Sequence, residues 1–128
     1  IAQGLFTYRS GLESARQLLG RPTRPTAIFA SNDDMAAGVI AVAHGLRLHV
    51  PEDLAVCGFD DTPVATTVWP EVTTIHQPIA DMARSAVDLV IDQIRRRRAG
   101  EPKRVQHQVL PFSLIRRESS GQEPPAAS

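Results

Sequence analysis

The sequence has few of the residues that crosslinking, metal binding or membrane insertion would need. Its 128 residues include one cysteine, Cys57, which excludes an internal disulfide and a cysteine-based zinc site and fits a reducing cytoplasm. The 14 basic and 14 acidic residues cancel, so the strongly basic surface of a free-standing nucleic-acid-binding domain is absent, and nothing favours an anionic membrane surface. No apolar run approaches the roughly 18 residues that a membrane helix needs.

Catalytic and cofactor-binding motifs are also missing from the sequence. There is no glycine-rich phosphate loop, no G-x-S-x-G nucleophile motif, no H-E-x-x-H pair and no dinucleotide-binding fingerprint. The four histidines show no pair four residues apart, which argues against a metal site on a helix. We therefore expect a protein that is not an enzyme and that holds neither a metal nor a cofactor.

Apolar periodicity alternates between helical and strand patterns along the chain. The composition, 42% hydrophobic and 22% charged, is that of one globular domain. Helical patterns follow Gly11 and cover residues 34–46 and 79–98, whereas strand patterns cover 27–31, 54–59, 72–75, 105–109 and 112–115. The two longer strand patterns are almost continuously apolar, as in sheets covered on both faces. This order predicts an α/β fold with a parallel sheet flanked by helices.

The longest helical pattern carries one apolar face and a basic end. The predicted core face is formed by residues at three- or four-residue steps, namely Ile79, Met82, Ala83, Ala86, Val90 and Ile94. The run of four arginines at 95–98 has two interpretations. It is a solvated helix end whose cations oppose the negative pole of the helix dipole, or it is a small nucleic-acid-binding patch. No interleaved aromatic residues support the second interpretation.

Polar residues follow two of the predicted strands, where α/β sheets bind their ligands. After residues 27–31 come Asn32 and Asp33. We expect Asp33 to cap the next helix, which would leave Asn32 to present a donor and an acceptor to a ligand. After residues 54–59 come Asp60 and Asp61, which are either part of a turn or, for Asp60, a carboxylate that binds hydroxyl groups. Cys57 is expected to be inert in the core.

Several ordered strings in the sequence resemble the LacI/GalR family of bacterial transcription regulators. They are FTY at 6–8, PTAIFASNDDMAAG at 25–38, VPEDLAV at 50–56, GFDD at 58–61, VTTIHQP at 72–78 and the closing Leu110-Pro111, Leu114-Ile115 and Arg117. Each string is modest alone. Their order and spacing over residues 4–118 make the resemblance specific.

The resemblance implies part of a periplasmic-binding-protein-like (type I) fold with two subdomains. Residues 1–75 would belong to the C-terminal subdomain, residues 76–105 would cross over and add a helix to the N-terminal subdomain, and 106–118 would return as a strand. Residues 119–128 are expected to be a disordered tail. The helix-turn-helix headpiece of the family, and most of its first subdomain, would lie outside this chain.

The resemblance also implies site residues. Asn32, Asp60 and Gln77 match positions that contact the small-molecule effector, and Ile79 stands where some members place an aromatic residue against it. Met35, Val39, Val42 and Trp69 match the homodimer interface. The family usually has glycine where Arg47 stands.

The function implied is that of a cytoplasmic regulator without a cofactor, which binds a sugar or related polyol and changes operator binding by hinge motion. Operator DNA would be contacted only through the headpiece, and no membrane would be involved. A fragment of a periplasmic-type sugar-binding receptor is the alternative.

Overall fold

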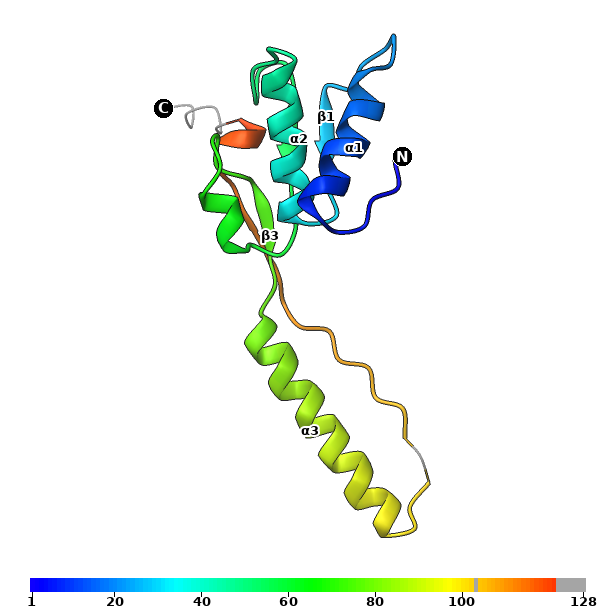
Figure 1. Cartoon of the computed structure of the whole chain (residues 1–128). Helices are drawn as coiled ribbons and strands as arrows, with labels where there is room; N and C mark the ends of the chain where they lie inside the picture. Colours follow the sequence, from blue (N-terminus) through cyan, green and yellow to red (C-terminus); the bar gives the residue numbers. More distant parts are fainter. Residues whose placement is uncertain (103, 122–128) are drawn as a thin grey trace, which may run out of the picture. The chain divides into compact units, whose positions relative to one another are not determined.

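We describe the chain from a computed structural model that covers residues 1–102 and 104–121. The chain divides into two compact units. Unit 1 contains Ile1–His76 together with the residues from Ser113 onward, and unit 2 contains Gln77–Phe112. Unit 1 carries most of the secondary structure, and unit 2 is a long helix with the extended segment that follows it (Figure 1).

The first helix of unit 1, α1 (Tyr8–Leu19), begins with a reciprocal cap. The Thr7 side chain accepts a hydrogen bond from the Ser10 backbone N–H, and the Ser10 hydroxyl accepts one from the Thr7 N–H. This capping box satisfies two amides that the first turn of a helix would leave unpaired. The helix therefore begins at Tyr8, three residues before Gly11, whereas the sequence pattern predicted a helix that follows Gly11.

A parallel strand pair lies at the centre of unit 1. Strand β1 (Ala27–Phe29) pairs with β2 (Ala55–Cys57), with Ile28 opposite Val56, and helix α2 (Asp33–Gly45) connects the two strands. A short 3-10 helix, η1 (Pro63–Thr66), follows. This helix–strand–helix–strand order confirms the predicted α/β fold with a parallel sheet.

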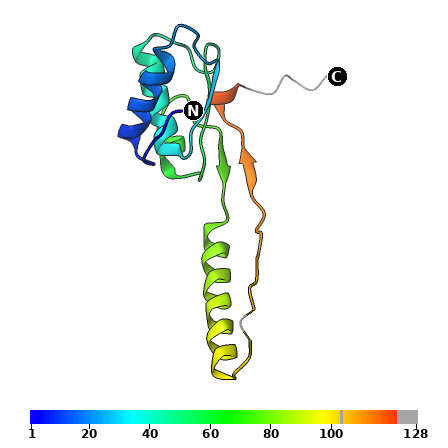
Figure 2. The same cartoon turned by 90° about the vertical axis from the view of Figure 1, so that its right-hand side faces the viewer.

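Two short strands form a second, two-stranded sheet. Strand β3 (Thr74–His76) pairs antiparallel with β4 (Ser113–Ile115), and His76 lies opposite Ser113 at the end of the pair (Figure 2). Single parallel bridges, Cys57 to Thr73 and Asp60 to His76, join β2 to β3. The expected strand at 105–109 is not formed, which is a correction: within the described residues no neighbouring strand pairs with it.

The core of unit 1 lies around α2, which packs against α1, β2 and η1. Fully buried apolar side chains include Leu54, Val56 and Val72. The two helices approach closely because each has a glycine at the crossing: a Cβ on Gly11 would meet the Met35 backbone at 2.5 Å, and one on Gly38 would meet the Tyr8 carbonyl oxygen at 2.6 Å. Glycine is therefore required at both positions.

Arg47, which stands where the LacI/GalR family usually has glycine, lies just after the end of α2. Arg47 has a φ of 58°, in the left-handed region, and its N–H donates to the His44 carbonyl. The Leu48 N–H donates to the Ala43 carbonyl, so the chain closes the helix as a glycine C-cap would. A side chain in this conformation costs about 1 kcal/mol relative to glycine.

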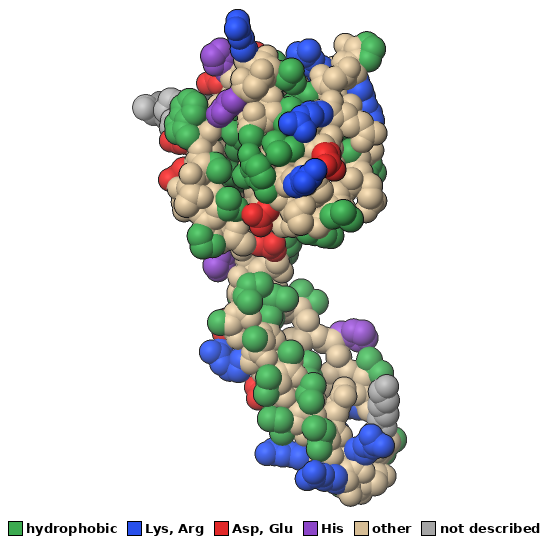
Figure 3. All heavy atoms as spheres, viewed as in Figure 1, with side chains coloured by type: hydrophobic (Ala, Val, Ile, Leu, Met, Phe, Trp, Pro, Cys, Tyr) green, Lys and Arg blue, Asp and Glu red, His purple; other side chains and the backbone are tan. Residues whose placement is uncertain are grey.

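Unit 2 contains α3 (Ile79–Arg98), whose bounds agree with the sequence pattern. None of its residues is buried, so the apolar face of the helix is exposed in this structure. Hydrophobic side chains run along the helix in Figure 3. Among them, Ile79, Val87 and Val90 each expose more than half of their area. The apolar periodicity marks a face that packs on a partner surface, but no such surface covers it in unit 2.

The first residues assigned to the predicted tail are structured. Glu118–Ser120 form a 3-10 helix, η2, and the fully buried Ser119 hydroxyl donates to the Val56 carbonyl at 2.6 Å. This contact fixes Ser119 to β2, which is why the chain is ordered at the first residues assigned to the tail. The remainder of that predicted tail, 122–128, lies outside the described residues.

Candidate functional site

The carboxyl ends of β1, β2 and β3 meet at one edge of unit 1. The Asp33 N–H donates to the Phe59 carbonyl at 3.0 Å, which joins the segments after β1 and β2. The Asp60 N–H donates to the Ile75 carbonyl at 2.9 Å, which joins the segment after β2 to β3. Polar residues that stand far apart in the sequence are thereby gathered at the edge where open α/β sheets bind ligands.

Asn32, and not Asp33, takes the capping role that we expected of Asp33. Asn32 is the N-cap of α2, and its Oδ1 accepts from the Met35 N–H at 2.9 Å. Its Nδ2 donates to the Phe6 carbonyl at 3.0 Å. The expectation that Asp33 caps the helix is wrong, because Asp33 is turned into the protein and fully buried.

Phe6 is a residue of this edge that the sequence analysis did not single out. Its side chain is 64% exposed, its φ is 57°, and its carbonyl is held by the Asn32 amide. A bulky residue with positive φ is strained, and such strain persists where the surroundings fix it. An exposed aromatic ring in a fixed position offers an apolar face to a ligand. The only local sign of this role is that Phe6 immediately precedes the capping box of Thr7 and Ser10.

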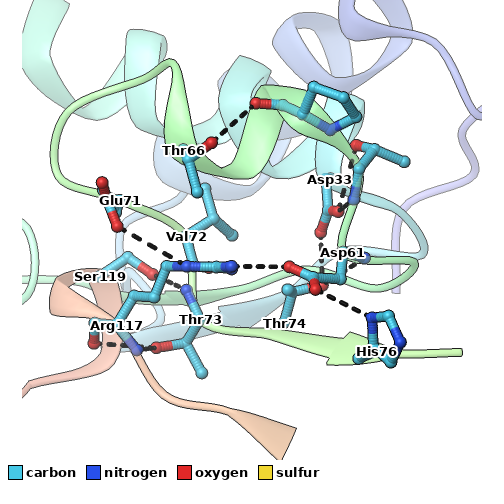
Figure 4. Close-up of polar contacts among 12 residues, drawn as sticks. Asp33, Asp61, Thr66, Glu71, Val72, Thr73, Thr74, His76, Arg117 and Ser119 are labelled. Atoms are coloured by element: carbon cyan, nitrogen blue, oxygen red, sulfur yellow. Dashed lines mark hydrogen bonds and ion pairs between the residues drawn. The ribbon is translucent and has the colours of Figure 1, made fainter.

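Asp33 forms the buried polar centre of the edge. Its Oδ2 accepts from the Thr62 N–H at 2.7 Å and from the Thr62 hydroxyl at 3.2 Å, and its Oδ1 accepts from the Thr74 hydroxyl at 2.6 Å (Figure 4). Gly58 leaves room for it, since a Cβ there would overlap with Asp33 Oδ1. The carboxylate also lies in the first turn of α2, where the helix dipole favours negative charge. Asp33 therefore organises the loop after β2.

The loop of residues 58–62, here called the aspartate loop, has an unusual backbone. Asp60 and Asp61 have φ values of 104° and 54°, both in the left-handed region. Consecutive non-glycine residues in this region require support from their surroundings. Asp60 is half-buried at the edge, and its backbone is fixed to β3 as described above.

Asp61 lies between two cationic or protonatable partners. Its Oδ1 accepts from Arg117 Nη2 at 2.7 Å, and its Oδ2 lies 3.0 Å from His76 Nδ1 (Figure 4). Arg117 also donates to the Val72 carbonyl at 2.9 Å, and its Nε lies 3.6 Å from Glu71. The hydrogen bond from Arg117 is the main cause that lowers the pKa of Asp61 below its usual value.

Acid should remove the stability that Asp61 contributes. Because the pKa of Asp61 is lower in the folded state, its contribution is complete above about pH 4 and is lost as the pH falls through the folded-state value. We expect the melting temperature to fall more steeply with acidification in the wild-type protein than in Asp61→Asn. Thermal melts between about pH 5 and pH 2 would check this. Parallel curves for the two proteins would contradict it.

The other predicted site residues lie in separate places. Gln77 directly follows β3, and Ile79, 55% exposed, begins α3; both belong to unit 2. Their participation in one site with Asn32 and Asp60 stays a prediction.

The predicted dimer residues differ in burial. Met35, Val39 and Val42 belong to the hydrophobic core of unit 1, at most 8% exposed, so they are not offered to a second subunit in this structure. Trp69 is 73% exposed, and its ring lies 5.9 Å from the His44 ring, centre to centre. Among these four residues, Trp69 alone retains the predicted role as a surface contact.

The described residues provide neither a metal-binding cluster nor a membrane-spanning helix. They contain no group of three or more histidine, cysteine or acidic side chains that could hold a metal ion. No helix in the described part of the chain is long and apolar enough to cross a membrane. The pKa of the Cys57 thiol is raised by burial, which fits the inert role expected for it.

Residues 2–120 match the family described as the periplasmic binding protein-like domain, and the chain belongs to this family. Membership of this family explains both the fold and the ordered strings in the sequence. Its relatives are transcriptional repressors, so the resemblance to the LacI/GalR family is confirmed.

Three similar proteins illustrate the relationship. The ribose operon repressor of Escherichia coli K12 is 43% identical over 91 residues, which are 71% of this chain and 28% of that protein. The transcriptional repressor CytR of the same strain is 39% identical over 105 residues, or 82% of this chain and 31% of that protein. The structure titled transcriptional regulator CelR-cellobiose complex has a TM-score of 0.82 at 38% identity, covering 91% of this chain and 35% of that one. The chain thus spans less than a third of the length of these two curated relatives.

Proposed function

We propose that this chain is the effector-binding part of a LacI-type, DNA-binding transcriptional regulator, and that it binds a sugar or related polyol at the edge described above. The observation that carries this proposal is the aspartate loop: Asp60 stands at a strand end, half-buried, on a left-handed backbone fixed by β3. Backbone strain that the surroundings maintain is typical of ligand-binding positions. A carboxylate accepts hydrogen bonds from neighbouring hydroxyl groups, which suits a sugar.

The surroundings of Asp60 supply complementary chemistry. Phe6 presents an exposed aromatic face, and Asn32 fixes the Phe6 backbone while capping α2. Sugars combine hydroxyl edges with apolar C–H faces, so a site that offers both a carboxylate and an aromatic ring would suit them. In this proposal Asn32 acts through Phe6 as well as by the direct contact expected from the sequence. We also propose Gln77 and Ile79, at the start of unit 2, as effector contacts, because the resemblance to the family implies this role for both positions.

The similarity to repressors supports a regulator over a periplasmic-type receptor. The cellobiose complex of one relative supports a saccharide as the class of effector. The same relatives support a cytoplasmic protein without enzymatic activity, since a transcriptional repressor acts where the DNA is. Operator binding would reside in a headpiece beyond the residues of this chain, and dimerisation would use the exposed Trp69 with His44.

The test is a titration of the full-length regulator with ribose, cellobiose, glucose and sucrose, in which isothermal titration calorimetry measures the affinity. For the sugar that binds, we expect Asp60→Asn to weaken affinity by about tenfold to a hundredfold, because one charged acceptor is lost. Asparagine tolerates positive φ, so the loop backbone is retained. Glu13→Gln, an exposed residue of α1 paired with Arg9, is the matched control and should bind normally. Unchanged affinity in Asp60→Asn would refute the proposed site.

A further inference from the structure

The chain passes between the two units at two points, and these points are paired with each other. It leaves unit 1 after His76, at the end of β3, and returns at Ser113, at the start of β4. His76 and Ser113 are partners in the antiparallel register. Any element of unit 1 that holds both strand ends therefore holds both crossings.

Asp61 contacts both of the paired strands: one carboxylate oxygen lies at the crossing end of β3, and the other contacts a residue that follows the far end of β4. Oδ2 lies 3.0 Å from His76 Nδ1, on the last residue before the outgoing crossing. Oδ1 accepts from Arg117 Nη2 at 2.7 Å, two residues after the returning strand. The side chains of Asp61 and Arg117 are only 19% and 15% exposed, so water screens their contact poorly.

The same residue is also joined to the proposed ligand site. Asp61 follows Asp60 in the aspartate loop, and its N–H donates to the Thr74 hydroxyl at 3.4 Å, which in turn donates to the buried Asp33. Both aspartates have a left-handed backbone, which fixes the orientation of the Asp61 side chain relative to that of Asp60. A shift of Asp60 toward a bound molecule must therefore move Asp61 or strain the loop.

We propose that Asp61 is a positioning residue that couples occupancy of the Asp60 site to the paired strands β3 and β4, through His76 at the crossing end of β3 and Arg117 after the far end of β4. This inference rests on the proposed function for its ligand, but the tie itself is independent of the ligand's identity. The Glu71 Oε2 atom lies 3.6 Å from Arg117 Nε, so Arg117 forms an ion pair with Glu71 as well as with Asp61. Asp61 is assigned no contact with the ligand.

Amide hydrogen exchange of the full-length regulator tests the tie without any sugar. We expect Asp61→Asn to accelerate exchange in residues 74–76 and 113–115 by about tenfold, because charge-assisted bonds that oppose local opening are lost. Exchange in α1 and the second half of α2 should not change. His76→Gln should accelerate the same amides in the wild-type background and add nothing in the Asp61→Asn background. Glu13→Gln is again the control.

Amide hydrogen exchange in the presence of the sugar panel tests the coupling. We expect bound sugar to slow exchange of residues 74–76 and 113–115 in the wild-type protein by about tenfold and to have little effect on them in Asp61→Asn. A merely structural role would leave the response to sugar intact in the variant.

Each outcome decides a separate claim. Unchanged exchange at both strand ends in Asp61→Asn, an equal rise throughout unit 1, or an additive effect of His76→Gln would overturn the positioning role. If no sugar binds the wild-type protein, the proposed function fails, and the exchange cycle alone still decides whether Asp61 holds the paired strands β3 and β4.

Discussion

Asp33→Ala is expected to lower the free energy of unfolding by about 4 kcal/mol, because it leaves one buried donor and two half-buried donors without an acceptor. These donors are the Thr62 N–H, the Thr62 hydroxyl and the Thr74 hydroxyl. Asp33 is fully buried, so water cannot replace the carboxylate unless the loop opens. Urea denaturation followed by circular dichroism would measure the loss.

The neighbouring acid provides the control for this variant. Asp34 stands in the same first turn of α2 and shares the favourable helix dipole, but it is only partly buried. Asp34→Ala should cost less than about 1 kcal/mol. If both variants lose equal stability, the buried network around Asp33 is not the source of the effect.

Gly38→Ala is expected to destabilise the protein by about 3 kcal/mol, at the upper end of overpacking effects. The new methyl group would meet the Tyr8 carbonyl oxygen at 2.6 Å and the Leu12 nitrogen at 2.8 Å, so the backbone of α1 would have to move. A flexible side chain could turn away, but a helix backbone cannot. The midpoint and slope of urea denaturation would give the change.

Gly45→Ala is the matched control, since Gly45 is the last residue of the same helix and nothing lies within 4 Å of its added Cβ. Alanine restricts the unfolded chain and suits a helix, so this variant should gain about 0.5–1 kcal/mol. Opposite signs at two glycines of one helix would show that the helix crossing, and not glycine itself, sets the effect. A loss at Gly45, or none at Gly38, would contradict this account.

The order of helices and strands could be predicted because it depends on local pattern. Apolar periodicity and stop residues placed α3 correctly, and the switch between periods placed the parallel strands. The burial of the α3 face could not be predicted, since a pattern shows that a face is apolar but not which surface covers it. The strand expected at 105–109 failed for a similar reason: alternation requires a neighbouring strand to become a strand.

The residues of the site were found by their position at strand ends, but their roles depend on distant partners. Asn32 and Asp33 have nearly equal capping preferences, so local rules could not order them. Thr74, 41 residues away, and the open space at Gly58 decide that Asp33 turns inward. Arg117 stands 56 residues from Asp61, and nothing in the local sequence of either indicates the pair.

The exposure of α3 has a thermodynamic consequence for the chain. Within the described residues α3 buries no side chain, so its helicity rests on local terms: propensity, the Asp81–Arg84 and Asp92–Arg96 pairs, and the terminal arginines. Each pair contributes only about 0.2–0.5 kcal/mol, and a helix held by such terms frays and melts gradually. The folding of α3 is then uncoupled from the cooperative core of unit 1. A surface that covers its apolar face would turn this gradual helix–coil equilibrium into part of a single transition.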